Sequence, residues 1–152
     1  MCRFIASALG AWLGCADVTA PPDTTTSVYV TLPDGQAHDQ FVRKDDAYVA
    51  ADELPAARDY FFRVVDDQGG ELSQDAVQCR KVHVDESGLF DLVYDADADG
   101  TPCKHPCKFA DDGGLALQLA PYADSTSGTY HVEVSASSDF KGAVARAFDV
   151  SL

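Results

Sequence analysis

Short runs of β-branched and aromatic residues, separated by turn-forming residues, constrain the fold of this chain more than any other feature. About seven such runs follow residue 27, with turn signals roughly every 8–15 residues. This spacing is typical of antiparallel sheets and not of folds that alternate strands with helices. The sequence therefore predicts an all-β fold, an antiparallel β-sandwich of about seven strands.

Most of the expected strands show a partial alternation of apolar and polar residues. The strands are expected at 27–32, 58–65, 77–84, 89–94, 114–121, 129–136 and 144–152, with a short apolar piece at 47–50. In three of these strands the alternation places three apolar residues on the same face of the strand: Leu115, Leu117 and Leu119; Tyr130, Val132 and Val134; and Phe148, Val150 and Leu152. In 77–84 it puts Cys79 and Arg80 on opposite faces. The best helix candidate, Asp45–Arg58, contains Pro55 and lacks an apolar stripe, so we expect no helix there.

The residues before these strands have the pattern of an export signal followed by a tether. One positive charge, Arg3, precedes an apolar stretch that is too short to span a bilayer. The stretch ends in Leu13-Gly14-Cys15, which resembles the lipobox of bacterial lipoproteins, where the cysteine is lipidated; ordinary cleavage after Ala16 is the alternative. We expect a lipoprotein-type signal peptide over 1–14, a Pro- and Thr-rich tether over 15–26 and one β-sandwich domain over 27–152.

The charge of the chain excludes several classes of partner. It has 25 Asp and Glu against 11 Lys and Arg, a formal net charge of −14. Such a surface disfavours nucleic acids and anionic lipids. Membrane attachment is therefore expected only through a lipid anchor on Cys15, with the protein exported to the outer membrane or cell surface, or secreted.

The acidic residues include one pattern that is typical of calcium loops. Three aspartates alternate over 95–99 and are followed by Gly100, which permits a sharp turn around a hard cation. The twelfth position of an EF-hand would be Pro106, so a full EF-hand is excluded. The expected Ca²⁺ ligands are Asp95, Asp97, Asp99, the carbonyl of Thr101, and Asp111, with Asp112 or water as alternatives to the last. A solvated acidic hairpin without metal is the other interpretation.

Three cysteines lie in the expected domain, and export favours disulfides. The odd number leaves one of Cys79, Cys103 and Cys107 unpaired. We expect Cys79 to pair with Cys103 or Cys107. Such a bond closes a loop of about 25 residues and contributes roughly 3–4 kcal/mol by loop entropy.

Neither zinc nor catalysis is expected. Cys79 and His83 would lie about 13 Å apart along a strand, too far to share one ion. His105 is close in sequence to Cys103 and Cys107, but side chains so close on an extended loop usually point apart. The chain also lacks G-x-S-x-G, H-E-x-x-H and glycine-rich phosphate motifs. We therefore expect that the protein is not an enzyme.

A resemblance adds to this interpretation. Residues 50–70 resemble prealbumin-like (SpaA or Cna-B type) surface domains, in which a Leu-Pro turn precedes an aromatic and Val-rich strand that ends in Asp and Gly. The resemblance extends over roughly 47–135, including the Cys-x-His at 103–105, and departs at 56–58, where a Pro- or Gly-containing turn is usual. It implies a sandwich outside the cell that serves structure, attachment or recognition. It also favours Cys103 as the partner of Cys79.

These observations lead to two expectations for function. The first is a non-catalytic bacterial surface lipoprotein domain that is stabilised by Ca²⁺ and has a structural, adhesive or assembly role. Its partner would be a protein, another component of the cell surface, or identical or different subunits of an oligomer. The second is a ligand-binding sandwich, for example a carbohydrate-binding module, or an accessory subunit of a surface complex. An exposed aromatic row would indicate ligand binding, and an unpaired strand edge would indicate assembly. Tyr60, Phe61 and Phe62 are expected in the core, although one face cannot hold all three.

Overall fold

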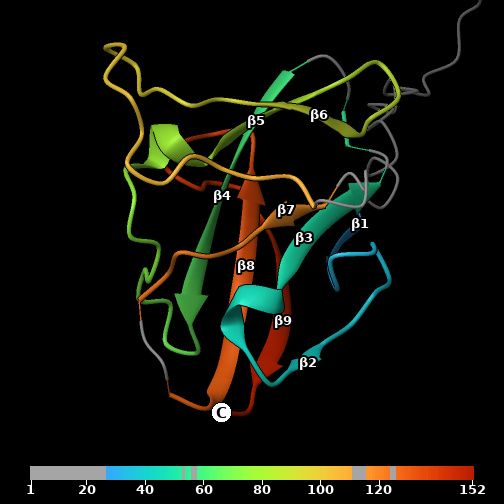
Figure 1. The fold of residues 1–152 in the computed structure, drawn as a ribbon. Helices are drawn as coiled ribbons and strands as arrows, with labels where there is room; N and C mark the ends of the chain where they lie inside the picture. The colour runs from blue at the N-terminus through green and yellow to red at the C-terminus, as the bar shows by residue number, and fades with distance from the viewer. Residues whose placement is uncertain (1–26, 53, 56–57, 111–115, 124–125) are drawn as a thin grey trace, which may run out of the picture.

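The computed structural model of the chain describes residues 27–52, 54–55, 58–110, 116–123 and 126–152 (Figure 1). The expected signal peptide, tether and Cys15 lie outside these ranges. Within them the chain forms nine strands and two short 3₁₀ turns, so the predicted all-β antiparallel sandwich is confirmed, with two more strands than expected. No helix in the described ranges has the length and hydropathy that crossing a bilayer requires.

The larger sheet has six strands in the order β2-β9-β8-β4-β5-β6. Its strands are β2 (Gln40–Phe41), β4 (Arg58–Asp66), β5 (Lys81–Val84), β6 (Phe90–Val93), β8 (Gly128–Ser135) and β9 (Val144–Val150). All neighbours are antiparallel except β2 and β9, which are parallel. Long strands β4, β8 and β9 form the centre of the molecule (Figure 1).

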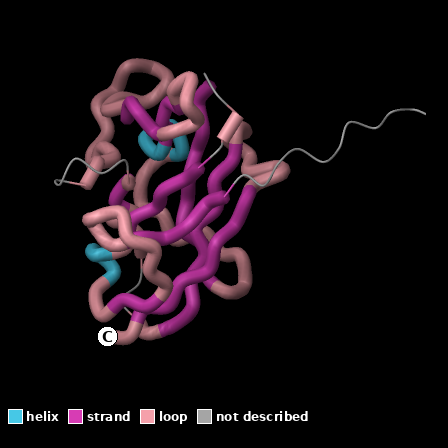
Figure 2. Tube along the Cα trace, turned by 90° about the vertical axis from the view of Figure 1, so that its right-hand side faces the viewer, coloured by secondary structure: helices cyan, strands magenta, loops and turns pink. Residues whose placement is uncertain are grey.

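The smaller sheet has three antiparallel strands in the order β1-β3-β7. They are β1 (Ser27–Thr31), β3 (Tyr48–Asp52) and β7 (Leu117–Gln118). The 3₁₀ turn η1 (Lys44–Asp46) leads into β3, where the sequence showed only a short apolar piece. Strands make up most of the regular structure, and the two short turns lie outside the sheets (Figure 2).

The core lies between the inner faces of the two sheets. Val30 and Val49 of the small sheet and Val64 and Val132 of the large sheet are all at most 2% exposed. An aromatic cluster closes one part of this core with mostly edge-to-face contacts, formed by Phe41, Tyr122, Tyr130 and Phe148. The alternation of apolar residues in β8 and β9 therefore gives the correct buried face.

Two sequence predictions fail at the ends of strands. Residues 77–80 form the 3₁₀ turn η2 (Val77–Arg80) instead of the first half of a strand. A strand would point Cys79 and Arg80 to opposite faces, whereas both are buried here. Leu152 was expected on the same face as the buried Phe148 and Val150 but is 62% exposed, because it lies beyond the end of β9.

Candidate functional site

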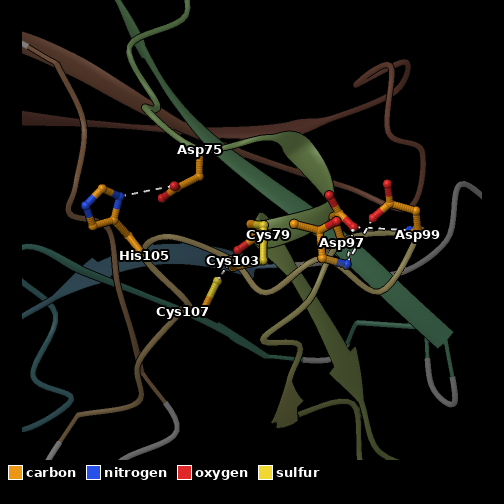
Figure 3. Close-up of a disulfide and its surroundings, with 8 residues drawn as sticks. Asp75, Cys79, Asp97, Asp99, Cys103, His105 and Cys107 are labelled. Carbon is orange, nitrogen blue, oxygen red and sulfur yellow. Dashed lines mark hydrogen bonds and ion pairs between the residues drawn. A yellow bond between two sulfur atoms is a disulfide. The ribbon is translucent and has the colours of Figure 1, made fainter.

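The segment that connects β6 to β7 contains the disulfide, the acidic loop and a hollow. Figure 3 shows Asp97 and Asp99 on one side of the disulfide, and His105 with Asp75 on the other. The described residues of this segment have little regular structure, so their arrangement depends on a few specific contacts with the rest of the protein.

The disulfide joins Cys79 of η2 to Cys103, with Cα atoms 5.7 Å apart. This agrees with the pairing that the resemblance favours, and among the described residues Cys107 is the free cysteine. Its thiol donates to the carbonyl oxygen of Cys79 at 3.0 Å, so the three cysteines that the structure describes meet at η2 (Figure 3). Because the sulfur atoms of Cys79 and Cys103 are bonded to each other, they are not available as thiolate ligands for zinc.

The free thiol is held in its neutral form. Burial raises the pKa of Cys107 to about 11; the positive charge of Arg80 opposes the shift, and the negative charge of Asp75 adds to it. The nearest expected base, His105, instead places its Nδ1 3.1 Å from Oδ1 of Asp75. A Cys–His nucleophile needs a thiolate next to its base, and the described geometry has neither.

Arg80 connects η2 to the residues that follow β7. Its side chain is 2% exposed, and Nη1 donates to the carbonyl oxygen of Leu119 at 2.6 Å while Nη2 donates to that of Pro121. The guanidinium also lies 5.3 Å from the ring centroid of Phe62. Burial lowers the pKa of Arg80, and nearby negative charges, including Asp75, oppose this. Sequence reasoning missed this role, because a single arginine in an expected strand gives no signal of burial.

The aspartates of the expected calcium loop form the tip of a hairpin. Oδ1 of Asp97 accepts the backbone N–H groups of Asp99 and Thr101 at 3.1 and 3.0 Å, and Gly100 closes the turn with φ +83°. Hydrogen bonds with Asp97 and Thr101 lower the pKa of the exposed Asp99 carboxyl to about 2. In this structure, two of the three carboxylates thus satisfy N–H groups of their own turn.

The same turn occurs at two other places. Oδ1 of Asp66 accepts the N–H groups of Gln68 and Gly70, and Oδ1 of Asp85 accepts those of Ser87 and Leu89. In both, the N–H of the glycine three residues after the aspartate donates to the aspartate carbonyl, and that glycine has φ of 82–83°. Turns were expected at 66–70 and 87–88 and an acidic hairpin was the alternative at 95–100, but the Asp-x-x-Gly pattern that the three turns share was not recognised as their common cap.

The expected calcium ligands are therefore only partly placed. Asp95, Asp97, Asp99 and Thr101 belong to this hairpin, and Asp111 lies outside the described residues. In the described ranges, no group of three His, Cys, Asp or Glu side chains is close enough to hold one ion. Calcium binding stays a prediction.

A hollow of about 330 Å³ lies between η1, the loop after the disulfide and the end of β7. Its lining combines two lysines with hydrogen-bonding and apolar groups: Asp45, Lys104, His105, Pro106, Lys108, Gln118, Ala120 and Pro121. The side-chain amide of Gln118 donates to the carbonyl oxygen of Asp45 at 3.0 Å, which connects two walls. Sequence reasoning did not find this hollow; the available signal was the pair of lysines around the Cys-x₃-Cys in an acidic chain.

No family model, curated protein or solved structure matches the chain. The resemblance to prealbumin-like surface domains stays a prediction, and the functional interpretation depends on the sequence patterns and on the geometry.

Proposed function

We propose that this protein is a non-catalytic, exported β-sandwich domain with a structural or adhesive role at the bacterial cell surface, anchored by a lipid on Cys15. The observation that carries the proposal is the Cys79–Cys103 disulfide, which ties an irregular loop to η2. Disulfides of this kind persist in oxidising compartments and are rare in the cytosol. The lipobox-like Leu13-Gly14-Cys15 supports the same location.

The surface favours a structural or assembly role over a carbohydrate-stacking platform. Among the described residues, the exposed large apolar side chains are Val42, Leu92 and Leu152, and none is aromatic. Tyr29 and Tyr48 are partly buried against a small alanine cluster, so they offer no free row for sugar rings. Leu92 lies on β6, an edge strand of the large sheet. An apolar residue on an edge strand is a common feature of surfaces that pair with another chain.

Export and anchoring are tested by expressing the full chain with its own N-terminus in a bacterium. We expect incorporation of labelled palmitate that is lost in Cys15→Ser, and digestion of the protein when intact cells are treated with protease. Peptide mapping without reductant should identify the Cys79–Cys103 bond. A reduced, unlabelled protein that remains inside the cell would contradict the proposal.

Stabilisation by Ca²⁺ is the second part of the proposal, and it is supported by the three alternating carboxylates of Asp95, Asp97 and Asp99 in the acidic hairpin. We expect a higher melting temperature in Ca²⁺ than in EDTA. Asp97→Asn is the matched variant, because an amide oxygen still accepts the two N–H groups of the turn but removes a ligand charge. Equal melting temperatures in Ca²⁺ and EDTA would contradict stabilisation by Ca²⁺, and the aspartates would then only accept hydrogen bonds from the N–H groups of their turn.

A further inference from the structure

The hollow beside the disulfide concentrates positive charge in a chain of net charge −14. Lys104 and Lys108 line it, are exposed, and form no ion pair with any described residue. Elsewhere in the described ranges Lys81 and Lys141 are paired with Asp59 and Asp139. Two lysines at one hollow without an ion-pair partner in the part of the chain that the structure describes are candidates to bind an anion from solution.

The type of cation indicates the type of anion. Arginine presents a planar fork that pairs with carboxylate and phosphate groups through two parallel hydrogen bonds, whereas lysine is a point charge that can approach an oxyanion from any side. The described lining of the hollow contains Lys104 and Lys108 but no arginine. Two lysine charges match the charge of about −1.5 to −2 on a phosphate monoester better than the single charge of a carboxylate, so the hollow favours a tetrahedral oxyanion of the phosphate or sulfate type.

The rest of the lining fits a polyhydroxylated ligand. The carboxylate of Asp45 and the amide of Gln118 can accept hydrogen bonds from hydroxyl groups. Pro106, Ala120 and Pro121 add apolar surface on which the C–H face of a sugar or polyol can lie. A volume of about 330 Å³ is at the small end of ligand pockets and suits one sugar-sized unit.

Each wall of the hollow is held by a specific contact. The disulfide fixes Cys103 at one end of the loop, and the hydrogen bond from Cys107 to Cys79 fixes the other. Arg80 binds the carbonyl groups of Leu119 and Pro121 on the opposite wall. Walls fixed in this way lose little further freedom when a ligand binds.

We propose that this hollow binds a phosphate- or sulfate-bearing sugar or polyol, with Lys104 and Lys108 contacting the oxyanion. The inference deepens the proposed adhesive role, because it names the chemistry of a surface component that the domain would recognise. His105 lies in the same lining, with its Nδ1 directed to Asp75 (Figure 3), and it contributes its remaining edge to the wall.

The test uses the purified full chain at low salt, titrated with glucose 6-phosphate and with glucose 6-sulfate and followed by NMR chemical shifts or calorimetry. Glucose and inorganic phosphate are the comparison ligands. We expect saturable binding of at least one sugar ester, no binding of glucose, and inorganic phosphate weaker by about tenfold or more. The preferred ester identifies whether phosphate or sulfate is the natural group. Binding should weaken as salt increases, because exposed charges are screened.

The lysines are tested with a pair of variants that change the net charge equally. Lys104→Gln with Lys108→Gln should weaken binding of the sugar ester by at least about tenfold. Lys141→Gln with Arg146→Gln, at exposed positions near and on β9 in the other sheet, should keep the affinity within about twofold. Far-ultraviolet circular dichroism verifies that both variants fold.

Three results would overturn the inference: no binding of either sugar ester, equal binding of glucose or inorganic phosphate, or full affinity in the Lys104/Lys108 variant. None of these affects the proposed export, which is measured separately by palmitate labelling and protease access. A negative result for ligand binding at the hollow is therefore distinguishable from a negative result for export and anchoring at the cell surface.

Discussion

Loss of the Cys79–Cys103 disulfide should strongly destabilise the domain. The bond links residues 24 positions apart. In the loop-entropy description, a bond that closes a loop of that size lowers the entropy of the unfolded chain. This raises the free energy of unfolding by about 3.5 kcal/mol. With about 2.1 cal/mol/K of unfolding entropy per residue over 27–152, this corresponds to a melting temperature lower by roughly 13 °C.

The test requires a background in which Cys79 cannot find another partner. Cys107 is already within hydrogen-bond distance of the Cys79 carbonyl, so we compare Cys107→Ala with the double variant Cys103→Ala and Cys107→Ala, both with Cys2 and Cys15 replaced by Ser. Urea unfolding under non-reducing conditions gives the free energy for both. A difference below about 1 kcal/mol would refute the loop-entropy argument. Adding reductant should lower the stability of Cys107→Ala and leave the double variant unchanged.

Four further results are expected. Arg80→Met should reduce the free energy of unfolding by about 2–3 kcal/mol in urea titrations, since two carbonyl groups lose their donor; an unchanged midpoint would contradict this. Gly100→Ala should cost about 1 kcal/mol because φ is +83°, whereas Gly128→Ala, in open space without positive φ, should not exceed about 0.5 kcal/mol. The Asp139 carboxyl should titrate by NMR with a pKa of about 2, below its ordinary 3.8, because of hydrogen bonds from Lys141 and Ser137. Its contribution to stability is then present above about pH 4 and is lost as the pH falls through 2. Asp139→Asn should remove this part of the loss of stability in acid. Cys107, with its pKa near 11, should resist iodoacetamide at pH 8 in the folded protein and react after unfolding, as peptide mapping can show.

Strands with a repeated apolar alternation were predictable from the sequence. The patterns at 58–65, 129–136 and 144–152 correspond to β4, β8 and β9 within one or two residues at each end. Tyr130, Val132 and Val134 are buried as expected, and Tyr60 and Phe62 lie in the core while Phe61 points to the other face. Periodicity succeeds here because each strand buries one face against a continuous core.

Contacts between distant segments were not predictable in the same way. β2 contains only two residues, so it offers too few positions for a pattern, whereas β7 is a short part of the strand expected at 114–121, with Leu117 and Leu119 buried. Tertiary contacts of Cys79 and Arg80 override the apparent strand at 77–80. The acidic loop was interpreted by its spacing of carboxylates, although the same spacing also forms an Asp-capped turn. The hollow combines residues from three separate parts of the chain.

The Asp-capped hairpins also affect how the protein ages. Asparagine can form the same cap, but it is among the thermolabile residues, and loss of its amide changes the charge of a turn. This chain contains no asparagine, and Asp66, Asp85 and Asp97 occupy the cap positions. Asparagine deamidation, a common form of chemical damage in tight turns, therefore has no substrate at these three hairpins.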